Sequence, residues 1–295
     1  MGYGYGEEAV RRRLVDVLGA SESGMSGTEL ASEMGISRIT LAKYLMAFEQ
    51  RGLVKSRPAG NVTIWYMGRG AGVYTFPDDY FRIESAYLDM VVSGDAEDVF
   101  SLVQNCIHSG ARPARLVTEA VLPALDSLDR MYDEGRLGGL ERALLRDTIS
   151  RSLHYMNRPA THPTPTKNCI LLAAEPREVM TCRAAAAALR SEGWRVHFPG
   201  DISALVDVFF DLDLRKLLGR VWKGTPGVMV LTVFGGDGEA LQFLAGSVDA
   251  VRKGTPGNIR LAFCSRTEGK RMGADVASES LADILQWCDT VHKSA

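Results

Sequence analysis

The chain has 295 residues, of which 46% are hydrophobic and 24% charged, and its formal net charge is -2. A chain of this length is expected to form two or three domains, each with its own core. No apolar run reaches the roughly 18 residues that a membrane span needs, and the residues after Met1 lack the apolar segment of a secretory signal. We therefore expect a cytoplasmic protein with no membrane partner.

The cysteine pattern argues against two classes of protein, and the charge distribution by itself identifies none. Five cysteines without a Cys-x-x-Cys pair argue against a disulfide framework and a zinc finger, so we expect reduced thiols. Residues 1–77 hold nine Lys and Arg against seven Asp and Glu, and the remainder holds 25 against 29. This asymmetry alone does not identify a nucleic-acid binder, which shows a clearly basic face.

Two helices are predicted near the start of the chain. Residues 7–18 place apolar side chains at helical spacing and predict an amphipathic helix. Ser26 and Glu29 have the spacing of a capping box, in which each side chain satisfies a backbone N–H group of the other, so a second helix is expected to begin near Gly27. Gly35 suits the left-handed conformation that ends a helix.

Ser37 predicts the start of a third helix. Its inward positions are expected to include Ile39, Leu41, Leu45 and Phe48. Its outward positions are expected to be Arg38, Thr40, Lys43 and Tyr44. A second and a third helix joined by a short turn predict a helix-turn-helix motif.

Residues 52–57 and 62–67 are β-rich, and the intervening residues 58–61 predict a tight turn. A hairpin after a helix-turn-helix predicts a winged helix domain over residues 1–77, with the third helix in the major groove of double-stranded DNA. The candidate DNA contacts are Arg38, Thr40, Lys43, Tyr44, Lys55 and Arg57. One alternative stays open, in which this domain mediates protein contacts.

The next region, residues 78–158, predicts a four-helix bundle. Apolar stripes of helical period cover residues 80–92, a segment capped by Asp95 that ends before Gly110, residues 113–131 and residues 140–155. A linker with three prolines, residues 158–166, then interrupts the helical pattern. We expect it to separate two domains.

Beyond the linker, apolar β-runs alternate with helical segments. The runs are residues 169–173, 195–198, 227–232 and 259–263. This alternation predicts a doubly wound parallel sheet of flavodoxin or Rossmann type over residues 167–295. The whole chain is thus expected to be a multidomain α/β protein with a winged helix-turn-helix, a central bundle and a C-terminal sheet domain.

A helical bundle followed by such a sheet resembles the cobalamin-binding module of methyltransferase carriers and of light- or cobalamin-responsive repressors. The resemblance covers about residues 80 to 290. It is carried by residues 116–125 with the turn 132–135, by residues 190–196 before the second strand, and by residues 273–275, which resemble the last strand. The resemblance implies a corrinoid site between the bundle and the sheet.

Several positions depart from the family pattern. The family carries Asp-x-His-x-x-Gly after its first strand, with the His as the lower ligand to cobalt, and the matching residues here are Glu178, Met180 and Arg183. Thr232-Val233-Phe234 and Cys264-Ser265 replace smaller motifs, and Tyr132 and Arg142-Ala143 replace the Trp and the Glu-His pair of the repressors. A thioether is a weak substitute for an imidazole held by a carboxylate. We therefore expect that conventional His-ligated cobalamin is not bound.

The crevice beyond the strand ends remains the expected ligand site. Its candidate residues are Tyr132, Glu178, Met180, Cys182, Thr232, Phe234, Gly235 and Gly236. The ligand stays unknown: haem, or a corrinoid held in another way, are both open, with His108, His154, Met180 and Cys182 as candidate axial donors. Gly235 and Gly236 suit either an anion or a tight turn. Cys182 suits either an activated thiol or an inert buried one.

These features together predict a DNA-binding transcriptional regulator rather than an enzyme. The C-terminal module is expected to sense a small-molecule effector or to act as a dimerisation scaffold, so we expect a homodimer or a higher homo-oligomer. The alternative is a corrinoid- or haem-binding sensor or carrier that uses the cleft between bundle and sheet.

Overall fold

The structure is a computed structural model, and it describes residues 6–21, 23–68, 70–157, 163–222, 227–255, 257–265 and 273–294. The contacts divide the chain into two compact units, Met1–Arg112 with Pro123–Tyr155, and Pro113–Leu122 with Met156–Ala295. Residues 158–162 of the expected proline-rich linker lie outside the described residues. The division into three domains stays a prediction, and the two units are described separately below.

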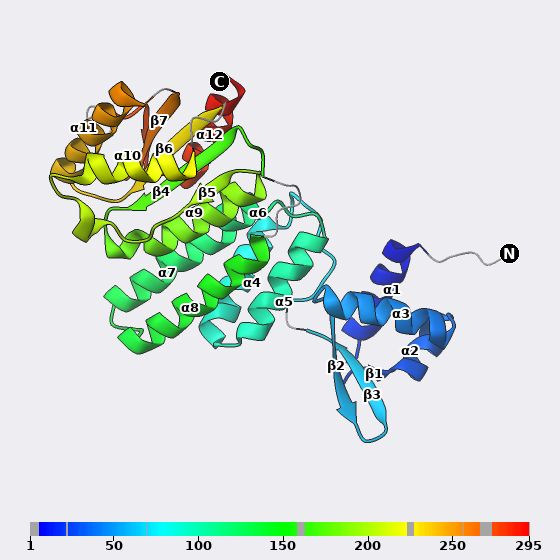
Figure 1. Cartoon of the computed structure of the whole chain (residues 1–295). Coiled ribbons are helices and arrows are strands. Elements are labelled where there is room, and N and C mark those ends of the chain that lie inside the picture. Colours follow the sequence, from blue (N-terminus) through cyan, green and yellow to red (C-terminus); the bar gives the residue numbers. More distant parts are fainter. Residues whose placement is uncertain are drawn as a thin grey trace. The chain divides into compact units, whose positions relative to one another are not determined.

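The first unit begins with a head, residues 6–67, in which helices alternate with short strands (Figure 1). The helices are α1 (Glu7–Gly19), α2 (Gly27–Met34) and α3 (Arg38–Gln50). The strands are β1 (Met25–Ser26), β2 (Val54–Ala59) and β3 (Val62–Met67). They form an antiparallel sheet in the order β1-β3-β2. Leu14, Leu30 and Leu45 are among the side chains that fill the head's core.

Local chemistry sets the helix ends of the head as expected. Ser26 and Glu29 form the capping box at the start of α2, with Ser26 N–H donating to Glu29 Oε2 over 2.8 Å. Gly35 ends α2 with φ +64°, in the left-handed region that glycine adopts without steric cost. Ser37 caps α3 by accepting a hydrogen bond from Thr40 N–H.

Two expectations about the orientation of α3 residues are wrong. Ile39 was expected to face inward but is 76% exposed, because it lies about 200° around the helix from the buried Leu41. Tyr44 was expected to face outward but is half-buried, stacks on Phe48 at 5.9 Å and packs against the core. The inward stripe is therefore Leu41, Leu45 and Phe48.

The hairpin is also tighter than the sequence predicts. Pro58 and Ala59 belong to β2, so only Gly60 and Asn61 form the turn. Pro58 is tolerated because β2 is an edge strand, where a missing N–H group breaks no ladder bond. The short strand β1 was not predicted.

Four longer helices complete the first unit. They are α4 (Tyr80–Ser93), α5 (Ala96–His108), α7 (Leu122–Asp133) and α8 (Gly139–Met156). Asp95 caps α5 as expected, accepting from Asp98 N–H. The Tyr87 hydroxyl meets Ser152 Oγ at 2.7 Å in a buried contact that joins α4 to α8. The predicted helical bundle is confirmed.

The third predicted helix of the bundle is interrupted. In place of one helix over residues 113–131, α6 (Pro113–Leu116) leads into a π-helical turn, Val117–Val121, before α7. Pro123 has no N–H group to donate to the carbonyl of Glu119, so the normal helical ladder is broken at this point. A π turn is one way in which a helix accommodates such a break.

The second unit contains a parallel sheet of five strands, in the order β5-β4-β6-β7-β8. The strands are β4 (Lys167–Ala173), β5 (Arg195–His197), β6 (Val228–Phe234), β7 (Asn258–Cys264) and β8 (Val276–Ser278). Their helices are α9 (Val179–Ser191), α10 (Phe210–Val221), α11 (Gly238–Gly254) and α12 (Leu281–Lys293). The last strand begins at Val276, whereas residues 273–275 were expected to form it.

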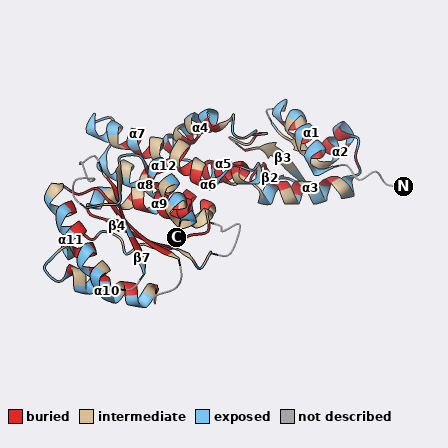
Figure 2. Cartoon of the chain, turned by 90° about the horizontal axis from the view of Figure 1, so that it is seen from above, coloured by how far each residue is buried: buried red, intermediate tan, exposed pale blue. Residues whose placement is uncertain are grey.

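Helices cover both faces of this sheet, which makes it doubly wound as predicted (Figure 2). One core joins the sheet to α10 and α11 and includes Leu172, Leu231 and Leu244. All seven residues of β6 are buried, as expected for a central strand covered on both faces. No helix among the described residues is long and apolar enough to cross a membrane.

Candidate functional site

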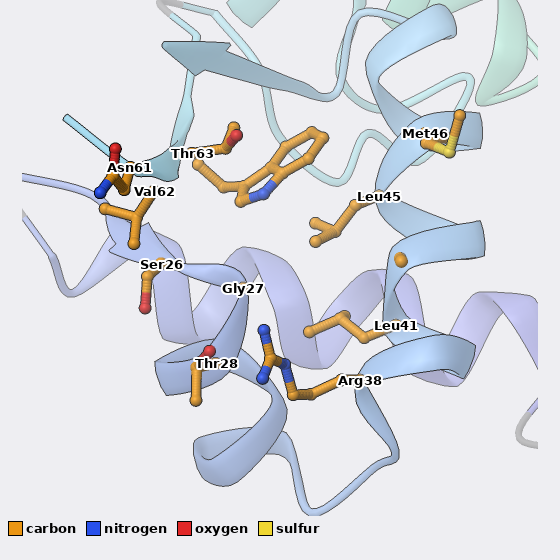
Figure 3. Close-up of a pocket in the computed structure, with 12 residues that line it drawn as sticks. Ser26, Gly27, Thr28, Arg38, Leu41, Leu45, Met46, Asn61, Val62 and Thr63 are labelled. Atoms are coloured by element: carbon orange, nitrogen blue, oxygen red, sulfur yellow. The ribbon is translucent and has the colours of Figure 1, made fainter. Parts of the chain in front are cut away.

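The outward face of α3 is the first candidate site. Arg38 is exposed at the first position of the helix and lines a hollow of about 360 Å³. The hollow lies between α3, the start of α2 and the hairpin, and Figure 3 shows the Arg38 guanidinium directed toward it. Hydroxyl groups of Ser26, Thr28 and Thr63 line the same hollow.

The other candidate contacts on α3 differ in how accessible they are. Lys43 is exposed, as expected. Thr40 is half-buried, and its hydroxyl lies 2.8 Å from Ser37 Oγ within the helix cap. Since Tyr44 packs toward the core, Arg38 and Lys43 are the two cationic side chains that α3 presents outward.

The two cations of β2 also differ. Arg57 is exposed, lies over the Tyr66 ring at 5.8 Å and donates to the Ser23 carbonyl over 3.4 Å. Lys55 Nζ lies 2.8 Å from Asp98 Oδ1 of α5. Lys55 was expected to meet a DNA phosphate, but this ion pair holds its ammonium group against the bundle.

Sequence reasoning missed the apolar character of the α3 surface. Ile39 and Met46 are 76% and 61% exposed, and Val62 near the tip of the hairpin is 51% exposed. The sequence predicted a core position for Ile39 and made no prediction for Met46 or Val62. For Ile39 and Met46, the helical angle relative to Leu41 and Leu45 was the available clue.

The second candidate site is the carboxyl edge of the parallel sheet, where β4 and β6 end side by side. Gly235 and Gly236 follow β6 with φ +72° and +94°. The Gly236 N–H donates to Glu175 Oε1 over 2.7 Å. A Cβ added at Gly235 would lie 2.7 Å from Glu178 Cγ. The loop after β4 therefore fills the space beside the two glycines.

Arg177 completes this contact between the two loops. Its Nε lies 2.5 Å from Glu175 Oε2 and 3.7 Å from Glu178 Oε1. The Glu175 carboxylate accepts the hydrogen bond from the Gly236 N–H group, which a ligand anion would otherwise accept. The two glycines thus serve a close turn rather than a site for a bound anion. Sequence reasoning missed Glu175, whose position directly after the first strand of the sheet was the clue.

The remaining candidate ligand residues of the second unit are largely buried. Met180 is 8% exposed, Cys182 and Phe234 are fully buried, and Thr232 is 1% exposed. Burial, with a smaller contribution from the Glu178 carboxylate, raises the pKa of the Cys182 thiol far above its ordinary value. Cys182 is therefore a protonated structural thiol, and not an activated one.

The candidate axial donors stand on three different helices, His108 on α5, His154 on α8, and Met180 and Cys182 on α9. His108 Nδ1 contacts the Gln104 carbonyl at 2.7 Å, and His154 Nδ1 contacts the Ser150 carbonyl at 3.2 Å, each within its own helix. Across the described ranges, no three His, Cys, Asp or Glu side chains gather as a metal would require. Tyr132 belongs to the first unit, where the Arg142 guanidinium lies 4.5 Å from its ring centre.

The comparison with solved structures explains this architecture. The monomethylamine corrinoid protein of Methanosarcina barkeri is similar over 70% of this chain and 96% of its own, with 11% identity and a TM-score of 0.50. Over the helical bundle and the parallel sheet, the fold is that of a cobalamin-binding module. A cobalamin-binding protein from Desulfitobacterium hafniense also matches, with 15% identity over the same shares and a TM-score of 0.34. The methanol:cobalamin methyltransferase complex of M. barkeri matches over 77% of this chain and 84% of its own, with 18% identity and a TM-score of 0.36.

No protein-family model and no curated protein matches the chain. The likeness therefore establishes the fold of the cobalamin-binding-like module and leaves its ligand to be judged from the residues present.

Those residues do not fit conventional cobalamin. Met180 stands where the family's histidine is expected, and its side chain is buried. The Glu175 carboxylate already accepts a hydrogen bond from the Gly236 N–H group, and Arg177 pairs with both Glu175 and Glu178. The cobalamin-binding-like module thus has the fold but carries a methionine at the position that matches the family's histidine.

Proposed function

We propose that this protein is a DNA-binding transcriptional regulator, and not an enzyme, whose C-terminal module has a cobalamin-binding fold without the histidine-ligated cobalamin site. The observation that carries the proposal is the face of α3, where Arg38 and Lys43 are exposed beside a hairpin that carries Arg57. In a winged helix-turn-helix protein, the helix in the position of α3 enters the major groove. Guanidinium and ammonium groups at that place contact base edges and phosphates.

We further propose that the protein acts as a homodimer or a higher homo-oligomer. Two heads related by a two-fold axis would bind half-sites about 34 Å apart, one turn of the duplex. A small-molecule effector of the second unit would then change DNA affinity by changing the spacing of the heads. Sedimentation of the free protein and of its DNA complex tests the association.

DNA selection with the full-length protein tests the proposed function. A random duplex pool should yield an enriched sequence, and the double variant Arg38→Ala with Lys43→Ala should bind that sequence at least about tenfold more weakly. Its affinity should also depend less steeply on salt, because fewer counterions are released. The matched control, Lys216→Ala with Arg220→Ala, removes two cations from α10 and should bind like the wild type. Failure to enrich any sequence, or an unchanged double variant, contradicts the proposal.

A second candidate function is corrinoid binding by the cobalamin-binding-like module, favoured by its fold. We expect the nucleotide tail, rather than the corrin ring, to be the part of cobalamin that competes with the contact between Glu175 and Gly236. Equilibrium dialysis with cobinamide, which lacks the tail, and with hydroxocobalamin separates these contributions. Binding of cobinamide at least as tight as that of hydroxocobalamin supports this candidate, and retention of neither corrinoid removes it. A hemin titration followed by the visible spectrum tests haem in the same way.

A further inference from the structure

The exposed face of α3 has an apolar centre. Successive residues turn by about 100° around a helix, so Ile39, Ala42 and Met46 fall within about 60° of one another. All three side chains are exposed. Arg38 and Lys43 flank this stripe, one on each edge, about 140° apart. The surface that would face a partner is thus a narrow apolar stripe between two cations.

Few hydrogen-bonding groups are available along this stripe. Thr40 is engaged with Ser37 in the helix cap. Glu49 is the first carboxylate on α3, and its Oε1 accepts from Ser56 Oγ of β2 over 2.6 Å. Residues 38–48 therefore combine two cations, no anion and an apolar centre.

The two flanking cations suit a polyanion on both sides of the helix. This is the charge pattern that a helix meets in the major groove, where phosphate strands run along both edges. The hollow beside Arg38 is lined by Thr28 and Thr63 and also by Ala42 and Met46, so it is continuous with the apolar stripe. Charge complementarity therefore favours duplex DNA as the occupant of the α3 face.

The base edges in the major groove offer one apolar group, the 5-methyl group of thymine. We infer that Ile39, Ala42 and Met46 recognise thymine methyl groups, so that the protein prefers a T-containing site through apolar contact more than through hydrogen bonds. This inference rests on the proposed DNA-binding function and assigns its sequence preference to residues that carry no charge.

Replacing thymine by deoxyuridine tests the inference, because it removes the methyl group and leaves every hydrogen-bonding group in place. In the enriched duplex, deoxyuridine at the contacted positions should weaken binding by the full-length protein about fourfold for each methyl group, as expected for re-exposing one methylene-sized group. The same replacement should have a smaller effect on the double variant Ile39→Ala with Met46→Ala, which removes most of the apolar surface of the stripe but keeps Ala42. This variant should retain the dependence on salt. Leu140→Ala, at a 92% exposed leucine of α8, is the matched control and should keep the wild-type response.

The outcomes separate the inference from the proposed function. If no duplex is enriched, the DNA-binding function fails, and the inference fails with it. If a duplex is bound but deoxyuridine at every thymine leaves its affinity unchanged, DNA binding stands and the inference is overturned. A double variant that dissociates the oligomer while keeping the wild-type response to deoxyuridine also overturns it, since the stripe would then be a protein interface. Thermal melting followed by circular dichroism checks that each variant is folded.

Discussion

Lys55 of β2 and Asp98 of α5 form an ion pair within the first unit, with 2.8 Å between Nζ and Oδ1. Side-chain exposure is 26% for Lys55 and 7% for Asp98, so the carboxylate has little access to water. A carboxylate in this position needs a partner to offset the loss of hydration. The ion pair therefore links the hairpin to α5. Because its ammonium group is engaged there, Lys55 is not among the cations that face outward.

Lys55→Met should destabilise the protein, because it leaves the Asp98 carboxylate buried without its partner. We expect a loss of about 2 kcal/mol, below the range for fully buried pairs because Lys55 keeps some exposure. Urea unfolding followed by tryptophan fluorescence measures it. Lys216→Met is the control, since it breaks the exposed pair with Asp213 and should cost less than about 0.5 kcal/mol. Equal losses in the two variants would show that the pair contributes nothing.

Gly52→Ala and Gly60→Ala should differ in stability. Both glycines have positive φ, +71° and +61°, so both substitutions carry a backbone strain of about 1 kcal/mol. A Cβ at Gly52 would also lie 2.8 Å from the carbonyl oxygen of Ser101 on α5, whereas one at Gly60 meets nothing within 4 Å. Gly52→Ala should therefore lose at least about 1 kcal/mol more in the same urea titration. A Gly60→Ala variant that is equally destabilised would argue against close packing of Gly52 on α5.

Gly235→Ala tests the contact between the loops after β4 and β6. The new methyl group would meet Glu178 Cγ at 2.7 Å with a backbone at φ +72°, and we expect a loss of about 2 kcal/mol. Gly246→Ala within α11 meets nothing within 4 Å and should be neutral or stabilising by up to about 1 kcal/mol. Differential scanning calorimetry compares the two. Tolerance of Gly235→Ala would mean that the Glu178 side chain leaves the turn readily.

The buried thiols should make the protein less stable in alkali. Burial raises the pKa of Cys264 and of Cys288 from 9.0 to about 12. Between pH 9 and 12 the folded protein therefore binds more protons than the unfolded chain. The contribution of these thiols to the free energy of unfolding is fully present below pH 9 and decreases as the pH rises toward 12. Each thiol should contribute up to about 1.4 kcal/mol per pH unit in this window.

Urea unfolding at several pH values between about 8 and 10 measures this decline. Cys264→Ala and Cys288→Ala should each flatten it, although each variant starts from a lower stability because of the cavity that it creates. Arg252→Gln is a control that leaves the thiols unchanged and should keep the full decline. Unaltered slopes in both cysteine variants would show that Cys264 and Cys288 are not the groups that titrate in this window.

Much of the fold could be predicted from the sequence where a short stretch of chain carries the information. Ser26 and Glu29 specify the start of α2, Ser37 caps α3 and Asp95 caps α5, because each cap joins groups only three residues apart. The three seven-residue strands β4, β6 and β7 were placed within about two residues for the same reason, since a covered parallel strand is a continuous apolar run. The doubly wound parallel sheet followed from the alternation of strands with helices, whereas the order of the strands came from the structure.

Other features depend on residues that are distant in sequence. The exposure of Ile39 depends on which face of α3 meets the core, and the pairing of Lys55 with Asp98 joins residues 43 positions apart. Glu175 and Gly236 meet across 61 positions, because parallel pairing brings the ends of β4 and β6 to one edge. The sequence by itself determined the capped helices α2, α3 and α5, the central strands β4, β6 and β7, and the methionine at the position of the family's histidine. Only the tertiary structure decided that Lys55 is paired while Arg38 stays exposed, and that the Gly236 N–H group is hydrogen-bonded to Glu175. Both outcomes depend on packing between elements that are distant in the sequence.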